Sequence, residues 1–268
     1  MQPSQTLSID GVAIHLDGDG SEAIVMVHGW PDTHRLWDGQ VAYLKERYRC
    51  IRFTLPGFDI AQPRRAVSLD QMSDFIRRVI EQLAPGKKAI LLLHDWGCLF
   101  GYQFYARYPQ LVSRIVGVDI GDTKNLKKAS PAREKLYIMA YQLWLSLAWR
   151  LGARTGDWMV LRMKRLMKSP SDERFMGSCM CYPYYYTWFG GDETYRKQFR
   201  RFEPSCPMLF VYAKRKPVKF HTEAWLEQLR SRKENGVVAF DTGHWIMLQQ
   251  PERFNRTVGD WLSAATVS

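Results

Sequence analysis

Hydrophobic and polar positions divide this chain of 268 residues into two alternating kinds of segment. Short apolar runs recur, as expected for strands that are buried on both faces of a parallel sheet. They cover residues 23–27, 50–54, 89–93, 114–118, 208–212 and 237–240. Three segments between the first four runs carry apolar side chains at helical spacing, and they cover residues 34–48, 69–83 and 96–108. This alternation of strand and helix predicts an open, mostly parallel α/β sheet flanked by helices.

Two parts of the chain depart from the alternation. Residues 7–16 alternate in polarity around Asp10-Gly11, which predicts an N-terminal β-hairpin. From about residue 123 to residue 202 the strand pattern stops, and an aromatic cluster and helix-like stretches, such as residues 132–151 and 157–167, replace it. We therefore expect a core made of residues 1–123 and 203–268, with a mostly helical cap inserted at residues 124–202.

Composition narrows the class of protein. The apolar share of 46% supplies material for a sizeable core, and the length fits one α/β domain with an insertion. Five scattered cysteines indicate reduced thiols, and the N-terminus has neither a basic start nor an apolar run. We expect a cytoplasmic protein. The longest apolar stretch, residues 136–149, is shorter than the ~20 residues that span a bilayer.

The net charge of +11 is concentrated in the predicted cap. Residues 124–202 contain 16 Lys or Arg and 6 Asp or Glu, whereas the rest of the chain contains 22 and 21. The basic side chains either solubilise a helical lid or favour acidic substrates or peripheral contact with an anionic membrane. No nucleic-acid-binding motif accompanies the charge, so we expect no nucleic-acid partner.

The most informative segment is the apolar run 89–93 that continues through His94 into Asp95-Trp96-Gly97. A strand, a sharp turn and a helix would hold Asp95 at the tip of the turn. The segment resembles the nucleophile elbow of the α/β-hydrolase fold, with aspartate in the place of serine. A carboxylate that attacks a saturated carbon leaves an ester, which water cleaves, so the resemblance implies epoxide or haloalkane chemistry. The alternative is that Asp95 only caps the following helix.

A second motif, Val27-His28-Gly29-Trp30-Pro31, follows an earlier strand. It resembles the His-Gly-x-Pro segment of α/β-hydrolases, which contributes a backbone N–H to the oxyanion hole. The resemblance implies that the amides of Trp30 and Trp96 are the two donors. The alternative is a tight turn that needs Gly29 and Pro31 only for its shape.

The loop after the last apolar run reads Asp241-Thr242-Gly243-His244, and it resembles the segment that carries the catalytic base of this fold. His244 would then activate the water that attacks the ester. The alternative is a structural histidine.

The chain offers more than one acid that could orient this base. Epoxide hydrolases take it from a Gly-x-x-Asp-Pro segment, but the corresponding residues 213–217 have Lys216 at the acid position. Some dehalogenases use the end of the preceding core strand, where this chain has Asp119 and Asp122. Matching the Arg-x-x-Gly start of that strand favours Asp122, with Asp119 as the second choice. The alternative is that both aspartates only end the strand.

An aromatic cluster late in the predicted cap supplies candidate substrate contacts. In epoxide hydrolases, cap tyrosines hydrogen-bond the epoxide oxygen, and by position Tyr186 resembles such a residue. The alternative is packing of the cap on the core. The cluster contains Tyr182, Tyr184, Tyr185, Tyr186 and Trp188.

The resemblance carried by these motifs spans most of the chain, and the chain is similar to epoxide hydrolases and haloalkane dehalogenases of the α/β-hydrolase fold. The resemblance implies an aspartyl-ester hydrolase for a small or lipid-like apolar substrate, with an epoxide opened to a diol as the first choice. No metal or organic cofactor is required. Dehalogenation is the second hypothesis. It would need Trp96 and a cap tryptophan to hold halide, the choices being Trp144, Trp149, Trp158 and Trp188.

A third hypothesis is a non-catalytic protein that docks through its basic cap. The lysine at the acid position, Lys216, is its main support. The sequence predicts no particular oligomeric state.

Overall fold

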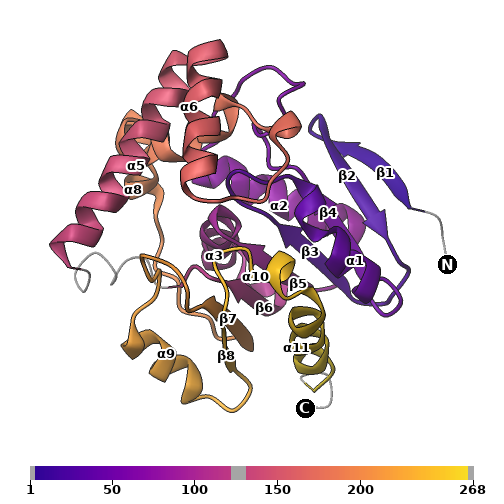
Figure 1. Ribbon diagram of the computed structural model, residues 1–268. Helices are drawn as coiled ribbons and strands as arrows, with labels where there is room; N and C mark the ends of the chain where they lie inside the picture. Colours follow the sequence, from indigo (N-terminus) through magenta and orange to yellow (C-terminus); the bar gives the residue numbers. More distant parts are fainter. Residues whose placement is uncertain (1–3, 122–130, 265–268) are drawn as a thin grey trace.

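A mostly parallel sheet of eight strands forms the centre of the computed structural model, which describes residues 4–121 and 131–264 (Figure 1). The strand order is β1-β2-β4-β3-β5-β6-β7-β8, and only the β1–β2 and β2–β4 pairs are antiparallel. This confirms the predicted α/β sheet. The strands are β1 (Gln5–Ile9), β2 (Val12–Asp17), β3 (Ala23–Val27), β4 (Arg49–Phe53), β5 (Ala89–His94), β6 (Val112–Val118), β7 (Met208–Ala213) and β8 (Gly236–Phe240).

The predicted hairpin is present as β1 and β2. Its two turn residues, Asp10 and Gly11, both have positive φ, at 52° and 76°. Two consecutive residues of this kind give the turn whose twist matches that of paired strands. The Asp-Gly dipeptide therefore fixes the register of the hairpin.

Helices cover both faces of the sheet. On one face lie α1 (Asp38–Leu44), α10 (Ile246–Gln249) and α11 (Pro251–Ala264), and on the other lie α2 (Leu69–Leu83), α3 (Trp96–Arg107) and α9 (Glu223–Arg230). Strand β3 shows why both faces of the sheet need a cover. Val25 belongs to one apolar cluster, whereas Ile24 and Met26 belong to the other. Alternate side chains of a strand point to opposite faces, so a strand buried on both faces is apolar throughout.

The predicted helix over residues 34–48 is divided in the structure. A 3₁₀ turn, His34–Trp37, is capped by Thr33, and α1 follows directly from Asp38. The helix ends at Leu44, and the chain enters β4 at Arg49. Trp37, at the junction, is completely buried, so the change of direction places its ring in the core.

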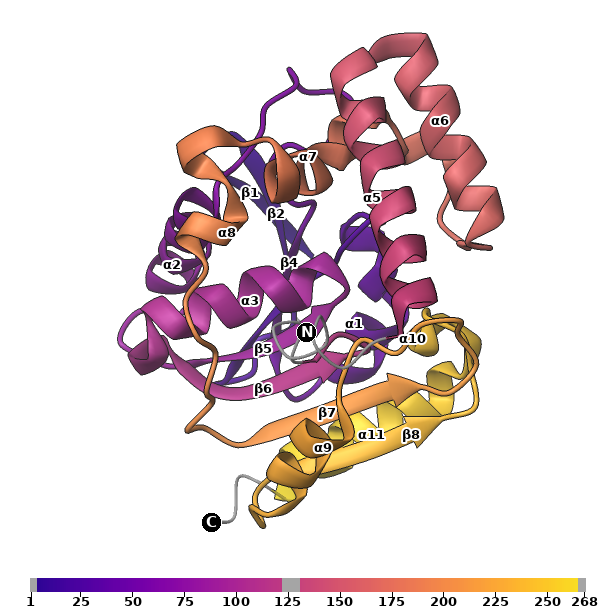
Figure 2. The same cartoon turned by 90° about the vertical axis from the view of Figure 1, so that its left-hand side faces the viewer.

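Residues 131–202, between β6 and β7, are mostly helical and lie over one end of the sheet (Figures 1 and 2). We call residues 131–202 the helical insertion. The predicted helix over residues 132–151 is confirmed as α5, and the next begins earlier than expected. The helices are α5 (Ala132–Leu151), α6 (Ala153–Leu166), α7 (Tyr182–Trp188) and α8 (Tyr195–Gln198), joined in part by 3₁₀ turns. The predicted start of the cap, residue 124, lies outside the described residues.

No helix within residues 4–121 or 131–264 combines the length and the apolar character that crossing a bilayer demands.

Candidate active site

Asp95 lies in a sharp turn between β5 and α3, as the elbow resemblance predicts. Its φ of 53° and ψ of −123° are unusual for a residue with a side chain. Glycines make the close approach of neighbouring segments possible. A Cβ added to Gly29 would lie 2.5 Å from the Trp96 amide nitrogen, and one added to Gly97 would overlap the backbone of Val27. The missing side chains of the motif glycines therefore allow the two loops to pack closely around Asp95, whose backbone is strained.

The two carboxylate oxygens of Asp95 have different partners. Oδ1 accepts the backbone N–H of Trp30 at 2.8 Å, and Oδ2 lies 3.4 Å from Nε2 of His244. Burial raises the pKa of Asp95, but contact with His244 and the Trp96 amide outweigh burial and hold it below the usual value. The carboxylate is therefore ionised at neutral pH, as a nucleophile has to be.

His244 joins Asp95 to a second carboxylate. Its Nδ1 contacts Oδ2 of Asp119 at 2.5 Å, and Asp119 follows the last residue of β6 with a φ of 70°. The other Asp119 oxygen, Oδ1, accepts the Ala213 N–H from β7. Burial alone would lower the pKa of His244, but the hydrogen bonds and charges of the two carboxylates raise it to about 9. The arrangement is that of nucleophile, base and orienting acid.

Asp119 takes the position that the sequence analysis favoured for Asp122. Asp122 itself lies outside the described residues. Because β6 ends at Val118, Asp119 is the first residue beyond the sheet, where loops from neighbouring strands meet. His244 Nδ1 donates a single hydrogen, and Asp119 already accepts it. Among the described residues, the acid that contacts His244 is therefore Asp119, the second choice of the sequence analysis.

Lys216, the unexpected basic residue in the loop after β7, contacts the same acid. Its Nζ lies 2.7 Å from Oδ2 of Asp119, and its side chain is only 6% exposed. Burial raises the pKa of Asp119, but Lys216 and His244 together lower it to about 2. The lysine therefore forms a buried ion pair with the acid that holds the base.

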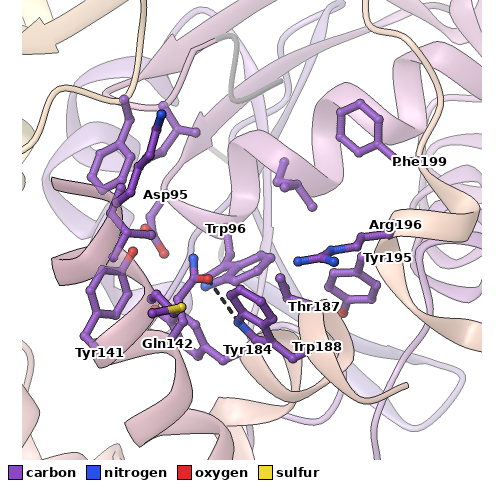
Figure 3. A pocket seen from close by; sticks show the side chains of 16 residues that line it. Asp95, Trp96, Tyr141, Gln142, Tyr184, Thr187, Trp188, Tyr195, Arg196 and Phe199 are labelled. Carbon is purple, nitrogen blue, oxygen red and sulfur yellow. Dashed lines mark hydrogen bonds between the residues drawn. The ribbon is translucent and has the colours of Figure 1, made fainter. Parts of the chain in front are cut away.

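A cavity of about 590 Å³ lies between Asp95 and the helical insertion (Figure 3). Its walls are mostly apolar and aromatic, and Lys135 and Arg196 add positive charge. Such a space suits a small or moderately long apolar molecule. The lining residues are Asp95, Trp96, Leu99, Ile120, Lys135, Ile138, Met139, Tyr141, Gln142, Tyr184, Thr187, Trp188, Tyr195, Arg196, Phe199 and Phe220.

The aromatic cluster contributes only part of what the sequence suggested. Tyr184 and Trp188 line the cavity, and Trp188 Nε1 donates to Gln142 at 3.1 Å. Tyr186, the first choice, does not line it, because its hydroxyl donates to Glu193 on the exposed side of the insertion. Tyr182 is completely buried and donates to the carbonyl of Pro56. Tyr185 packs against Tyr186 and Phe189.

Sequence reasoning missed Tyr141, a cavity residue on α5 (Figure 3). Its hydroxyl points toward the Asp95 carboxylate in that view. Burial and the Asp95 charge raise the pKa of both Tyr141 and Tyr184, so both hydroxyls remain protonated. The available signal was a second tyrosine one turn after Tyr137, in a stretch of the helix, residues 136–141, that has no charged side chain. Tyr195 also lines the cavity, but its hydroxyl donates to Val67.

The two motif histidines support the backbone. Nε2 of His28 accepts the Leu55 N–H, and Nδ1 is 2.9 Å from the Gly29 carbonyl oxygen. The ring of His94 lies 4.5 Å from that of His244, centroid to centroid. Burial lowers the pKa of His28 to about 4 and that of His94 to about 3, so both are neutral. In the part of the chain that the structure describes, no group of three or more His, Cys, Asp or Glu side chains is placed to hold a metal ion.

A sequence model of the alpha/beta hydrolase family matches residues 24–257. The chain belongs to the alpha/beta hydrolase family. The match runs from β3 to within α11, and so includes the loops that carry Asp95, Asp119 and His244.

Proteins similar to this chain include two whose names refer to small oxygen-containing rings. This alpha/beta hydrolase is 29% identical to epoxide hydrolase 1 of Caenorhabditis elegans over 150 residues, which are 52% of this chain and 37% of that protein. It is 28% identical over 162 residues to the cis-3-alkyl-4-alkyloxetan-2-one decarboxylase of Xanthomonas campestris, covering 56% of this chain and 50% of that protein. The matches thus span at most about half the length of these curated relatives.

The fold extends over the whole chain in solved structures. An epoxide hydrolase of Bacillus megaterium, crystallised with an inhibitor, superposes with a TM-score of 0.72. The comparison covers 97% of this alpha/beta hydrolase and 100% of that chain, at 18% sequence identity. At that identity the likeness establishes the fold.

Proposed function

We propose that this alpha/beta hydrolase opens epoxides to diols through an ester formed on Asp95. The observation that carries the proposal is the pair of partners of the Asp95 carboxylate. Oδ1 is held by the Trp30 N–H, while Oδ2 lies beside Nε2 of His244. Asp95 also lines the apolar cavity, so one carboxylate has an anchored oxygen, a reactive oxygen and a base within reach of substrate.

In the first step, Oδ2 attacks an oxirane carbon, the ring C–O bond breaks, and its electron pair moves to the ring oxygen. That oxygen needs a hydrogen-bond donor and then a proton. Tyr141 and Tyr184 are the candidates, because both line the cavity and both hydroxyls stay protonated beside Asp95. Donors of this kind accelerate such steps by ~10²–10⁴-fold.

In the second step, water attacks Cγ of the ester while His244 takes one of its protons. The Cγ–Oδ2 bond then breaks, and the diol oxygen leaves with the electron pair and receives that proton from His244. The second water proton leaves the new Asp95 carboxyl group and restores the tyrosine hydroxyl.

The Asp95 charge is one reason that the pKa of His244 is about 9, and esterification removes that charge. Loss of that charge lowers the pKa of His244, so the imidazole gives up its proton and is in the neutral form that can act as a base at the stage that uses it. The oxyanion forms on Oδ1, which the Trp30 N–H contacts, and donors of this kind contribute ~3–4 kcal/mol each. The Trp96 N–H, which also bonds the Asp95 carboxylate, is the proposed second donor.

A single turnover in H₂¹⁸O tests the proposal. Wild-type protein mixed in excess over a panel of apolar epoxides should give diol whose new oxygen is unlabelled, while ¹⁸O enters the peptide that contains Asp95. Asp95→Ala should give neither diol nor label. If the wild type yields no diol and no trapped ester from any epoxide, the proposed function fails.

Dehalogenation is the alternative with the next best support. Trp96 lines the cavity, and so does Trp188, one of the four tryptophans of the predicted cap. The Trp188 N–H is already donated to Gln142, however, so a halide would have to displace that hydrogen bond. Halide release from bromoalkanes without epoxide turnover would favour this alternative. The oxetanone decarboxylase among the relatives adds cis-dialkyl-oxetanones to the panel, since a carboxylate can attack that ring as well.

A non-catalytic docking protein receives less support. Lys216 suggested a disrupted site, but its ammonium pairs with Asp119 while the Asp119–His244 contact is intact. The cavity is also large enough for a ligand.

We extend the proposal to peripheral contact between the helical insertion and an anionic bilayer. Nine large apolar side chains of α5 and α6 are at least one-third exposed, Leu166 at 68%. Exposed apolar side chains gathered on two neighbouring helices are typical of an interaction site. The side chains are Leu136, Tyr137, Met139, Leu143, Trp144, Leu147, Leu151, Trp158 and Leu166.

Positive charge on the same helices favours lipid over a second copy of the chain. The exposed basic side chains of α5 and α6 are Arg133, Lys135, Arg150, Arg154, Arg162 and Arg165, and Lys168 follows the end of α6. Lys135 also lines the cavity. Two copies would bring these like charges together, whereas anionic headgroups attract them by about 1 kcal/mol per residue.

Co-sedimentation with vesicles tests this contact. The full chain should bind phosphatidylglycerol vesicles, bind phosphatidylcholine vesicles weakly, and dissociate in high salt. Leu147→Glu with Leu151→Glu should abolish binding, whereas Leu248→Glu, a matched exposed leucine on α10, should not. Dimerisation through this face without vesicle binding would overturn the proposal.

A further inference from the structure

Lys216 extends from the loop after β7 to the acid at the end of β6. Its Nζ lies 2.7 Å from Oδ2 of Asp119, 3.2 Å from the Asp119 carbonyl oxygen and 4.7 Å from the centroid of the Phe220 ring. An ammonium group that is almost fully buried is tolerated only with such partners. The side chain is therefore fixed against one carboxylate.

The decisive contact is a shared oxygen. Oδ2 of Asp119 touches both the ammonium of Lys216 and Nδ1 of His244, the latter at 2.5 Å. Oδ1 is occupied by the Ala213 N–H, so the carboxylate cannot turn to separate its two charged neighbours. Removal or addition of charge at residue 216 thus acts directly on the base.

We propose that Lys216 is a positioning residue that offsets the charge of Asp119 and thereby sets the pH at which His244 works as a base. Without the lysine, protonated His244 would be the cation that balances buried Asp119, so the imidazole would hold its proton to higher pH. With the lysine present, the carboxylate still orients the imidazole but attracts its proton less strongly. The consequence for turnover rests on the proposed function, whereas the effect on His244 does not.

Other ionisable groups also face these residues. Asp95 approaches His244 from the elbow, the ring of His94 lies 4.5 Å from that of His244, and the charge of buried Asp32 also acts on His244. His94 is neutral, and burial raises the pKa of Asp32 to about 6. The neighbours of Lys216 include His221, whose pKa is lowered to about 4 by burial and by the lysine. Once Asp95 is esterified, the charged groups that act on His244 include, among residues 4–121 and 131–264, Asp119, Lys216 and Asp32.

Proton titration of the His244 ring by NMR tests the inference without substrate. Lys216→Met and Lys216→Gln remove the charge, and the glutamine can still donate to Asp119. Both should raise the His244 midpoint by about one pH unit. Lys216→Arg should restore the wild-type midpoint to within a few tenths. Lys214→Met, which removes the same charge from an exposed position in the same loop, should leave it unchanged.

Single-turnover kinetics give the second readout. In Lys216→Met, ester formation should persist while the pH profile of ester hydrolysis moves upward, which slows hydrolysis about tenfold at pH 7 for each unit. An unchanged or lower His244 midpoint in both charge-removing variants would overturn the inference. So would an equal loss of rate at every pH, since that indicates a structural role alone. If wild type forms no ester, the proposed function fails, and the NMR titration still decides the role of Lys216.

Discussion

The backbone N–H of Trp30 donates to Oδ1 of Asp95 at 2.8 Å, across 65 residues of sequence. Strands β3 and β5 are neighbours in the sheet, so the loops that follow them emerge side by side. Gly29 lets those loops touch, because its missing side chain leaves room for the Trp96 amide. The candidate nucleophile is therefore held by a donor that the fold supplies before any substrate binds.

Substitution Gly29→Ala should abolish this arrangement. The new Cβ would lie 2.5 Å from the Trp96 nitrogen, so one loop has to move and the Trp30 donor is lost. Turnover should fall by at least ~10²-fold, with a lower melting temperature. Gly39→Ala is the control, since a Cβ there meets nothing within 4 Å and the residue lies in α1. Full activity in Gly29→Ala would contradict the proposed donor.

Substitution His244→Gln should separate the two proposed steps. Attack by Asp95 needs no base, so epoxide should still be consumed once, but hydrolysis should slow by ~10²–10⁴-fold. Intact-protein mass spectrometry should then detect a stable adduct with the mass of the epoxide. The adduct should map to Asp95 and be absent from His244→Gln combined with Asp95→Ala. An adduct on another residue would rule out the proposed nucleophile.

Substitution Asp119→Asn should cost far more activity than Asp122→Asn. The amide cannot accept and fix the Nδ1 hydrogen of His244 as a carboxylate does, so ester hydrolysis should fall by ~10²–10⁴-fold. We expect Asp122→Asn to change the rate by less than about threefold. Rates of ester hydrolysis in the two variants, measured at several pH values, provide the comparison. The reverse order would return the acid role to Asp122.

Removal of single cavity hydroxyls should identify the proton donor. Tyr141→Phe and Tyr184→Phe should each slow ester formation by ~10²–10³-fold, because the ring oxygen loses a donor. Tyr186→Phe should leave the rate unchanged, since that hydroxyl is bonded to Glu193. Pre-steady-state kinetics of ester formation make the measurement. A large effect of Tyr186→Phe alone would restore the choice made from sequence.

The stability that His244 contributes should depend on pH. The hydrogen bonds and charges of Asp119 and Asp95 overcome burial and raise its folded-state pKa to about 9, from an ordinary value of 6.5. A raised pKa stabilises the fold fully below pH 6.5, and the contribution disappears as the pH rises through 9. Denaturant unfolding should therefore show the wild-type advantage over His244→Gln shrinking between pH 6 and pH 10. A constant difference over that range would exclude an ionised His244 as its source.

Local sequence determined the sheet and the elements around it. Runs such as residues 89–93 are apolar at every position because both faces of a central strand are covered, and that pattern needs no knowledge of the fold. The Asp-Gly turn and the positions of Asp95 and His244 were readable for a related reason. Each lies directly after a strand, next to a glycine whose conformational freedom the local backbone requires.

Tertiary structure alone decided which side chains meet. Asp119 and Asp122 follow the same strand, and only the meeting of the loops after β6, β7 and β8 gives Asp119 to His244. Likewise, the local pattern does not show which of the four clustered tyrosines faces the cavity. The packing of α7 against α5 directs Tyr184 toward Asp95, whereas the Tyr186 hydroxyl donates to Glu193. By local sequence, Lys216 indicates a site without its acid, whereas in the fold its ammonium group pairs with Asp119. Periodicity records which face of an element is buried, whereas contacts between distant loops depend on distances that no local pattern contains.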